Sequence, residues 1–251
     1  MPEYQMTLMN RQKIARETMA FWLNTNGTKY EFRAGQHADF AFLDPSAQHE
    51  GDNCRTFSLA NSPQDKSRIM IALRMRETGF KTALTLAPVG TRFQVSRPRG
   101  SFTLHKDATR PAVFLAGGIG ITPFRSILHW ASQERLPHKL YLFYSNRHLD
   151  DAAFFEEFDD LTALNPRFRF IPTLTAFESP AWPYEHGPIN QGLLTRYLQS
   201  LHGPVYYAAG PSRMVSAMTN LLHCSGVSDD DIKTEEFGDY NSINRRGSEP
   251  R

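Results

Sequence analysis

One stretch of the chain, from Ala112 to Leu128, constrains the fold more than any other. It reads AVFLAGGIGITPFRSIL: apolar residues typical of a buried strand, a glycine-rich turn, and apolar residues at helical spacing that start near Thr122 and Pro123. Glycines let an anion approach the backbone closely, and the N–H groups at a helix start attract phosphate. Thr122 and Pro123 stand where the dinucleotide fingerprint GxGxxG would have its third glycine. The stretch therefore predicts a strand, a turn suited to phosphate and a helix; a tight turn without a ligand is the alternative.

Length and composition limit the class of protein. With 251 residues, of which 40% are hydrophobic, the chain can form two compact domains. It has no apolar leader and no run of about 18 apolar residues, the length that a membrane span needs, so we expect no membrane segment and a cytoplasmic location. Its two cysteines, Cys54 and Cys224, cannot form a disulfide framework or a four-thiolate iron–sulfur cluster, and no metal site is expected.

The net charge of +2 hides an uneven distribution. Between Arg68 and Arg110 there are nine basic residues and two acids, whereas Asp150 to Asp160 carries six acids and no base. A basic first half suits an anionic cofactor or an acidic protein partner; the alternative is a pair of solvated faces. No helix-turn-helix, zinc or RNA-binding pattern accompanies the basic residues, so nucleic-acid binding is not expected.

From Met6 to about Leu104 the sequence predicts short strands and almost no helix, which is typical of an antiparallel barrel. The predicted strands are Ala20–Leu23, Tyr30–Phe32, Ala38–Leu43, Cys54–Leu59, Ile69–Met75 and Thr91–Val95. One short helix is expected over Lys81–Leu86. The first domain is therefore predicted to cover residues 1–108.

After Lys106–Pro111 the pattern changes to strands that alternate with helices. The predicted elements are Val113–Ala116, Pro123–Gln133, Leu140–Tyr144, Ala152–Ala163, Phe168–Thr173, Leu193–Leu201, Val205–Ala208 and Arg213–Cys224. This predicts a doubly wound parallel α/β domain over residues 109–240, with ligands at the carboxyl ends of its strands. Residues 241–251 are polar and are expected to form a flexible tail.

Five motifs, in order along the chain, resemble those of the ferredoxin-NADP reductase family. They are RTFS at Arg55–Ser58, GFKT at Gly79–Thr82, GGIGITP at Gly117–Pro123, AGP at Ala209–Pro211 and EEF at Glu235–Phe237. The resemblance spans about residues 14–240. It implies an N-terminal antiparallel β-barrel that binds FAD, followed by an α/β domain that binds NAD(P)H. FAD is favoured over FMN because the chain ends in a tail like that of the reductases.

The resemblance assigns the flavin site to the first two motifs. It implies that Arg55 meets the flavin pyrophosphate, that Phe57 packs on the flavin, and that Ser58 lies beside the reactive nitrogen. The flavin-binding segments also include Thr56, Gly79, Phe80, Lys81 and Thr82. Phe57 replaces the tyrosine that is usual in the family, which removes a hydroxyl but keeps the packing surface. Arg74, where the family often has lysine, either reaches a cofactor phosphate or lies on the surface.

The other three motifs are assigned to the nicotinamide and to the flavin face that it meets. The residues implied to bind cofactor there are Gly117, Gly118, Gly120, Thr122, Pro123, Gly210, Pro211 and Phe237. Ala209 stands where many members have cysteine, so a thiol has no direct role. Glu235 is interpreted as a catalytic residue, together with Ser58, that relays protons or orients the nicotinamide; a surface acid is the alternative.

The choice of hydride donor stays open at this point. The sequence Thr175, Ala176, Phe177 has no arginine after the third strand of the second domain, which favours NADH. Asn146 and Arg147, after the second strand, offer a guanidinium suited to the 2′-phosphate of NADPH. We therefore write the donor as NAD(P)H.

The implied activity is hydride transfer from NAD(P)H to FAD, followed by transfer of electrons to a separate acceptor. An acidic ferredoxin or a flavodoxin would suit the basic first half. The alternatives are a non-catalytic flavin-binding subunit of a larger complex and a nucleotide-sensing protein without flavin. The sequence does not indicate an oligomeric state.

Overall fold

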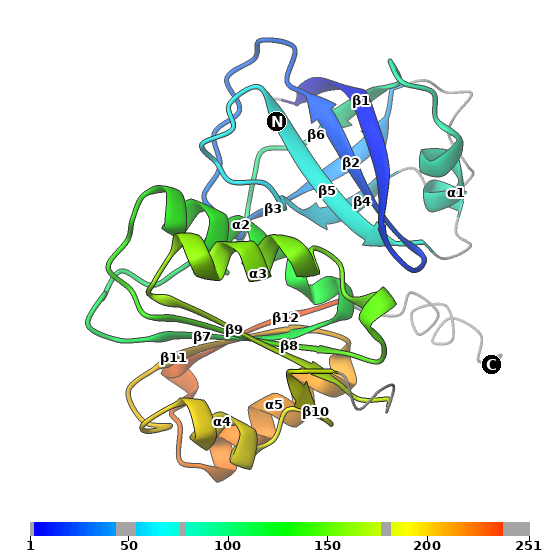
Figure 1. Ribbon diagram of the computed structural model, residues 1–251. Helices are drawn as coiled ribbons and strands as arrows, with labels where there is room; N and C mark the ends of the chain where they lie inside the picture. Colours follow the sequence, from blue (N-terminus) through cyan, green and yellow to red (C-terminus); the bar gives the residue numbers. More distant parts are fainter. Residues whose placement is uncertain (1–2, 44–53, 76–78, 177–181, 238–251) are drawn as a thin grey trace, which may run out of the picture.

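The computed structural model describes residues 3–43, 54–75, 79–176 and 182–237 (Figure 1). Within these ranges, the N-terminal part forms a six-stranded antiparallel sheet and the C-terminal part a six-stranded parallel sheet with helices on both faces. This confirms the predicted fold class. The predicted tail, residues 241–251, and Phe177 lie outside the described residues.

The antiparallel sheet has the strand order β4-β3-β6-β1-β2-β5. Its elements are β1 (Tyr4–Ala15), β2 (Thr18–Asn24), β3 (His37–Phe42), β4 (Cys54–Ser58), β5 (Arg68–Arg74), α1 (Gly79–Leu86) and β6 (Arg92–Val95). Buried and half-buried side chains alternate along β3, as expected when one face of a strand fills a barrel interior. That interior is rich in aromatic rings, including Phe21, Phe40 and Phe93.

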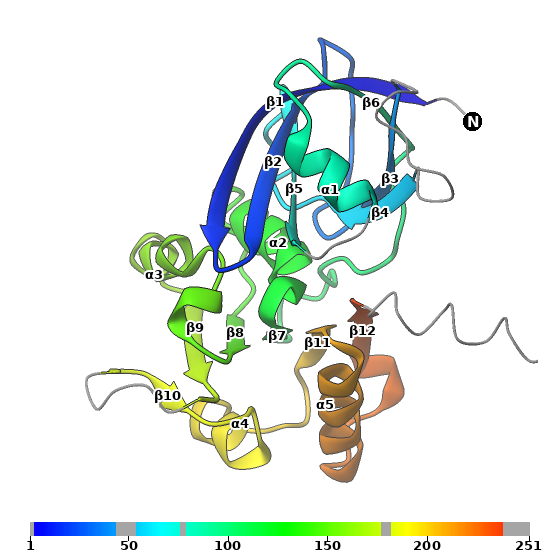
Figure 2. The same cartoon turned by 90° about the vertical axis from the view of Figure 1, so that its right-hand side faces the viewer.

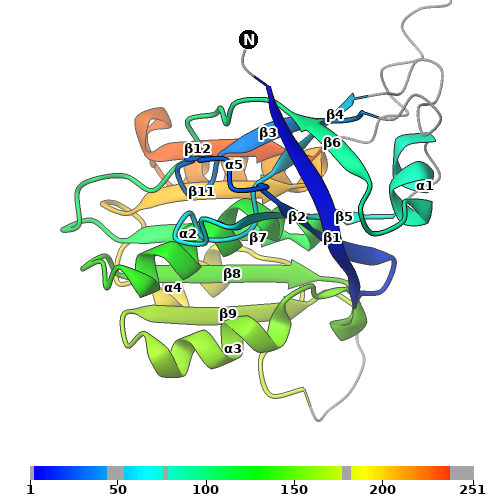
Figure 3. The ribbon, with the colours of Figure 1, turned by 90° about the horizontal axis from the view of Figure 1, so that it is seen from above.

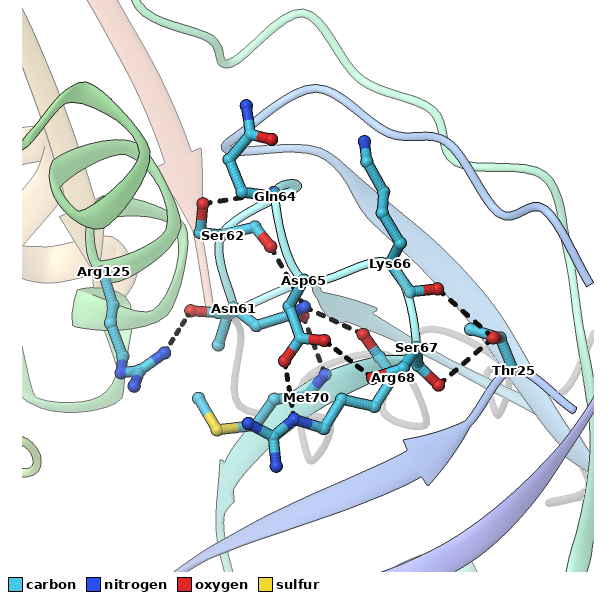
Figure 4. A network of polar contacts seen from close by, with 11 residues as sticks. Thr25, Asn61, Ser62, Gln64, Asp65, Lys66, Ser67, Arg68, Met70 and Arg125 are labelled. Atoms are coloured by element: carbon cyan, nitrogen blue, oxygen red, sulfur yellow. Dashed lines mark hydrogen bonds and ion pairs between the residues drawn. The ribbon is translucent and has the colours of Figure 1, made fainter. Parts of the chain in front are cut away.

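Asn61 closes the seam between the two end strands, β4 and β5 (Figure 4). The backbone N–H of Ala60 donates to the carbonyl of Met70 (2.8 Å). The N–H of Met70 then donates to Asn61 Oδ1 (2.8 Å), and Asn61 Nδ2 donates to the carbonyl of Arg68 (3.0 Å). The buried amide side chain thus replaces a backbone partner at the seam.

The parallel sheet has the order β10-β9-β8-β7-β11-β12. Its strands are β7 (Ala112–Gly117), β8 (Leu140–Asn146), β9 (Phe168–Leu174), β10 (Glu185–His186), β11 (Val205–Gly210) and β12 (Ile232–Glu236). Every residue of β7 and β11 is buried, because these strands are central and covered on both faces.

Helices cover the parallel sheet on two sides. They are α2 (Ile121–Gln133), α3 (Phe155–Leu164), α4 (Gln191–Tyr197) and α5 (Ser212–Cys224), with short 3₁₀ turns η2 (Gly118–Gly120), η3 (Leu149–Asp151) and η4 (Asp229–Asp231). Figure 1 shows α2 and α3 between the sheet and the barrel, and α4 and α5 on the opposite face. Among the described residues, no helix combines the length and the hydrophobicity that a membrane span requires.

The two domains share a hydrophobic core around α2. From the barrel side it includes Met70 and Phe102, and from the parallel domain Phe124 and Ile127. Polar contacts reinforce this interface: Arg125 Nη1 donates to the carbonyl of Ala60 (2.8 Å), and Ser126 Oγ donates to the carbonyl of Asn61 (2.6 Å). The helix that follows the glycine-rich turn is therefore fixed directly to the barrel seam.

Several predicted elements were wrong in detail. Tyr30–Phe32 is not a strand; Tyr30 and Phe32 are buried in the barrel core, so their apolar pattern reflects packing. Strand β1 was not predicted, because residues 9–13 are exposed and carry no apolar alternation. The helix predicted over Ala152–Ala163 begins only at Phe155, since Phe154 has a left-handed backbone (φ +61°). The helix predicted over Leu193–Leu201 ends at Tyr197.

Candidate functional site

The two predicted catalytic residues, Ser58 and Glu235, meet across the domain boundary. Ser58 ends β4 of the barrel, and Glu235 lies on β12, opposite Ala209 of β11. Ser58 Oγ donates a hydrogen bond to Glu235 Oε1 (2.9 Å). Burial raises the pKa of the Glu235 carboxyl above its ordinary value, and the hydrogen bond from Ser58 only partly offsets this. The fold thus joins a half-buried carboxyl and a buried hydroxyl that lie 177 positions apart.

The glycine-rich turn has the geometry of a ligand cradle. Strand β7 ends at Gly117, and α2 begins directly after η2. A Cβ on Gly120 would lie 2.3 Å from the carbonyl oxygen of Ala209, so a side chain there would push α2 away from β11. Gly118 is different: its φ is +52°, and no described atom lies within 4 Å of the position of a Cβ. Gly118 therefore faces open space, while Gly120 maintains tight packing.

Thr122 and Pro123 are both buried within the first turn of α2. The hydroxyl of Thr122 donates to the carbonyl of Ile119 (3.1 Å), which stabilises the turn. The contribution of these two residues to a binding site is thus the shape of the turn rather than a side-chain contact.

Gly210 and Phe237 lie at the same edge of the parallel sheet. Gly210 ends β11 with a φ of +154°, and a Cβ there would lie 3.0 Å from the carbonyl oxygen of Gly117. The N–H of half-buried Phe237 donates to the carbonyl of Gly210 (2.9 Å). Pro211, which is exposed, follows directly and precedes α5. The AGP turn, the glycine-rich turn and the EEF segment are therefore neighbours.

On the barrel side, β4 separates its motif residues onto two faces. The ring of Phe57 lies 5.8 Å from the rings of Phe40 and Phe80. Thr56 points to the opposite face, as alternation along a strand requires, and its hydroxyl donates to Asp39 Oδ1 (2.5 Å). Arg55, half-buried, shares the face of Phe57, because it lies two residues away.

The start of α1 completes this side of the site. Lys81 Nζ donates to the carbonyl of Arg74 (2.8 Å), which places the first turn of α1 at the end of β5. Phe80 is buried and anchors the helix, while Thr82 is exposed and Gly79 is half-buried. The first turn of α1 carries no acidic residue, so its N–H groups and the nearby Lys81 suit a diphosphate, while the charge of Arg74 is shared with Glu17 (3.3 Å).

Asn146 and Arg147 lie at the carboxyl end of β8. Asn146 is buried, and its Oδ1 has no hydrogen-bond partner within the described part of the chain. Arg147 is exposed. The carbonyls of these two residues accept from the N–H groups of Thr175 (2.9 Å) and Ala176 (3.0 Å). Only Arg147 is therefore exposed to a ligand at this edge, while Asn146 is buried behind it.

Sequence reasoning missed the polar cluster of Asp39, Arg99 and Thr56. Arg99 Nη2 donates to Asp39 Oδ1 (2.6 Å), and Arg99 Nη1 contacts the other carboxylate oxygen. This pairing holds the pKa of Asp39 below its ordinary value. Asp39 and Arg99 are 60 residues apart, so no local pattern could have paired them.

Comparison with known proteins agrees with this arrangement. Residues 114–220 match the family model of the oxidoreductase NAD-binding domain. The chain is 30% identical over 200 residues to a component of the Na⁺-translocating NADH-quinone reductase of Methylococcus capsulatus, covering 73% of this chain and 49% of that protein. It is 29% identical over 210 residues to a phenol hydroxylase P5 protein of Acinetobacter pittii, covering 82% and 58%. The chain thus spans about half the length of these relatives.

Solved structures share the fold over nearly the whole chain. The flavohem-like FAD/NAD-binding domain of nitric oxide dioxygenase from Vibrio cholerae superposes with a TM-score of 0.82 at 18% identity, covering 94% of this chain and 99% of that one. At this level of identity the similarity establishes the arrangement of the two domains.

Proposed function

Because the chain belongs to the ferredoxin-NADP reductase-like oxidoreductases, whose cofactors are FAD and NAD(P)H, we propose that it moves a hydride from NAD(P)H to bound FAD and then delivers electrons to a separate acceptor. The observation that carries this proposal is the 2.9 Å hydrogen bond between Ser58 and Glu235, formed where the barrel meets the glycine-rich edge of the parallel sheet. In this proposal residues 1–108 bind FAD, and residues 109–240 bind the dinucleotide.

FAD would be held on the barrel side. Arg55, Arg74 and Lys81 neutralise the diphosphate together with the N–H groups at the start of α1. Phe57 offers an aromatic surface that its contacts with Phe40 and Phe80 keep in place. When bound, FAD supplies the two-electron chemistry that no side chain of this protein can perform.

Ser58 and Glu235 are proposed to hold and exchange protons where the barrel meets the carboxyl edge of the parallel sheet. The raised pKa of Glu235 brings its proton exchange closer to neutral pH, and Ser58 is within hydrogen-bond reach of it. In this proposal Glu235 exchanges protons with solvent, and the hydroxyl of Ser58 orients toward the acceptor atom of the flavin. Phe237, tied to Gly210, covers this edge until the nicotinamide displaces it.

The dinucleotide would bind across the carboxyl edge of the parallel sheet. Gly118 leaves room for the pyrophosphate beside the start of α2, whose partial positive charge attracts it. Arg147, exposed at the carboxyl end of β8, contacts the 2′ position of the dinucleotide, and buried Asn146 precedes it in the same strand end. Gly120 and Gly210 keep the strand ends close enough to form one binding edge.

The acceptor is proposed to be a small acidic electron carrier, such as a ferredoxin or a flavodoxin, in the cytoplasm. The excess of basic residues between Arg68 and Arg110 favours this choice. A second candidate is a flavin-binding electron-transfer subunit of a larger complex, because one relative is part of an NADH-quinone reductase.

The decisive experiment is the visible spectrum of the full chain reconstituted with FAD, followed by anaerobic addition of NADH or NADPH. The proposal expects a flavin spectrum that bleaches with at least one of the two donors and recovers when a ferredoxin, a flavodoxin or ferricyanide is added. Recovery with ferricyanide but with neither carrier would favour the second candidate. A chain that neither retains FAD nor oxidises either dinucleotide would refute both.

A further inference from the structure

The tip of the β1–β2 hairpin reaches out of the barrel and contacts the parallel domain. Arg16, at this tip, donates from Nε to Asp151 Oδ1 (2.9 Å) and from Nη2 to Asp151 Oδ2 (2.7 Å). Its backbone N–H also donates to the carbonyl of Asp150 (2.6 Å). Figures 2 and 3 both show the hairpin extending toward the segment that follows β8. A two-point ion pair of this kind fixes orientation as well as distance.

The partner of Arg16 is the central group of a compact turn. The side chain of Asp151 is only 8% exposed. Its Oδ2 also accepts from the N–H of His148 (3.3 Å), and its own N–H donates to the carbonyl of His148 (3.1 Å). Burial opposes the ionisation of Asp151, yet Arg16 holds the pKa of this carboxyl below its ordinary value. Arg16 therefore stabilises the turn that begins immediately after Asn146 and Arg147.

The same hairpin tip also contacts the barrel edge that leads into α1. The carboxylate of Glu17 pairs with Arg74 Nη2 (3.3 Å). The carbonyl of Glu17 accepts from the N–H of Met75 (2.6 Å). Two adjacent residues thus connect the turn after β8 to the end of β5, where the diphosphate of FAD is proposed to bind.

We propose that Arg16 is a positioning residue for dinucleotide binding: through Asp151 it fixes the turn that presents Asn146 and Arg147, so that the adenosine half of the dinucleotide is held at a set place relative to the barrel. This inference rests on the proposed function, because it concerns the same dinucleotide edge. It assigns no chemistry to Arg16 itself, which lies on the barrel and acts through Asp151.

The test compares Arg16→Ala with Arg68→Ala in the full chain. Arg68 is a matched control, because its side chain is 48% exposed against 46% for Arg16. Its ion pair with Asp65 (2.6 Å) joins two residues of the barrel domain and does not reach the parallel domain. The probe is ADP-ribose, with and without a 2′-phosphate, titrated by calorimetry without nicotinamide chemistry. In parallel, KM and kcat are measured with the better donor and ferricyanide.

For Arg16→Ala we expect Kd for ADP-ribose to rise about fivefold, because the turn released from Arg16 must be ordered again when the ligand binds. KM should rise by a similar factor while kcat changes by less than about twofold. Arg16→Lys should recover part of the affinity, and Asp151→Asn combined with Arg16→Ala should cost no more than either change alone. Arg68→Ala should leave Kd unchanged.

Unchanged Kd in Arg16→Ala would overturn the inference, as would an equal loss in Arg68→Ala or additive losses in the double variant. If the unmodified chain bound no ADP-ribose and oxidised no dinucleotide, the proposed function would fail and this inference with it. If the unmodified chain binds ADP-ribose normally, an unchanged Kd in Arg16→Ala contradicts only the role of Arg16 and not the proposed function.

Discussion

Replacement of Asn61 by alanine is expected to destabilise the folded protein by about 2–4 kcal/mol, because its side chain closes the barrel seam. The change removes three hydrogen bonds: the 2.8 Å bond from the Met70 N–H, the 3.0 Å bond to the carbonyl of Arg68 and a 3.2 Å bond to the carbonyl of Ser62. Met70 is only 1% exposed, so water cannot reach its N–H in the variant. An unsatisfied buried donor costs about 1–3 kcal/mol, and the lost hydrogen bond adds about 1 kcal/mol.

Equilibrium unfolding in urea, followed by far-ultraviolet circular dichroism and tryptophan fluorescence, measures this loss. Amide hydrogen exchange at Met70 gives a local reading, since its N–H should lose protection in the variant. Asn61→Asp is a graded test: it keeps an acceptor for Met70 but sets a carboxylate against the Arg68 carbonyl. Asn220→Ala, an exposed change on α5, should stay within about 0.5 kcal/mol. A loss below about 1 kcal/mol in Asn61→Ala, with Met70 still protected, would refute the closing role of this side chain.

Three further predictions concern the candidate site. Glu235→Gln should slow flavin reduction and raise the melting temperature at pH 8 but not at pH 4. Burial raises the pKa of Glu235, so the wild-type chain loses stability as pH rises through that pKa, and the variant does not. The same pH dependence of the melting temperature in the variant and in the wild type would contradict this. Gly120→Ala should cost about 3 kcal/mol of stability and weaken ADP-ribose binding, since its Cβ would lie 2.3 Å from the Ala209 carbonyl oxygen. Gly192→Ala is the control, because Gly192 is exposed and its Cβ would lie 3.3 Å from Asn190 Oδ1. Wild-type stability in Gly120→Ala would contradict the tight packing. Arg147→Ala should raise KM for NADPH about tenfold and leave KM for NADH within twofold, because only NADPH carries a 2′-phosphate for the guanidinium to bind. Equal changes in KM for both donors would rule out a contact between Arg147 and the 2′-phosphate.

The order of the two domains was accessible from the sequence because it depends on local signals. Strands β7, β8, β9 and β11 are apolar runs followed by helical periodicity, and such patterns survive in any tertiary context. The exposed half of β1 and the edge strand β10 carry no comparable signal, because side chains that face solvent on both sides need no apolar alternation. The strand predicted over Tyr30–Phe32 was wrong for the opposite reason, because both aromatic residues are buried without belonging to a strand.

The candidate site was only partly accessible from the sequence. Motifs pointed to Ser58 and Glu235 separately, but their hydrogen bond depends on how the barrel sits on the parallel domain. Alternation along the strand gives the face of Thr56, but its hydrogen bond to Asp39, 17 positions away, is not predicted by any local spacing. The contact of Arg16 with Asp151 joins residues 135 positions apart, beyond the reach of any local pattern.

The core shared around α2 has a practical consequence for anyone who exchanges modules between related reductases. A cut near residue 108 would separate Met70 and Phe102 from Phe124 and Ile127. Each half would then expose a hydrophobic patch that favours aggregation in water. The carbonyls of Ala60 and Asn61 would lose Arg125 and Ser126 in the same operation. A chimera cut after α2 would keep these contacts but would break the pairing of β7 with β8 and β11, so the whole two-domain chain is the unit to exchange.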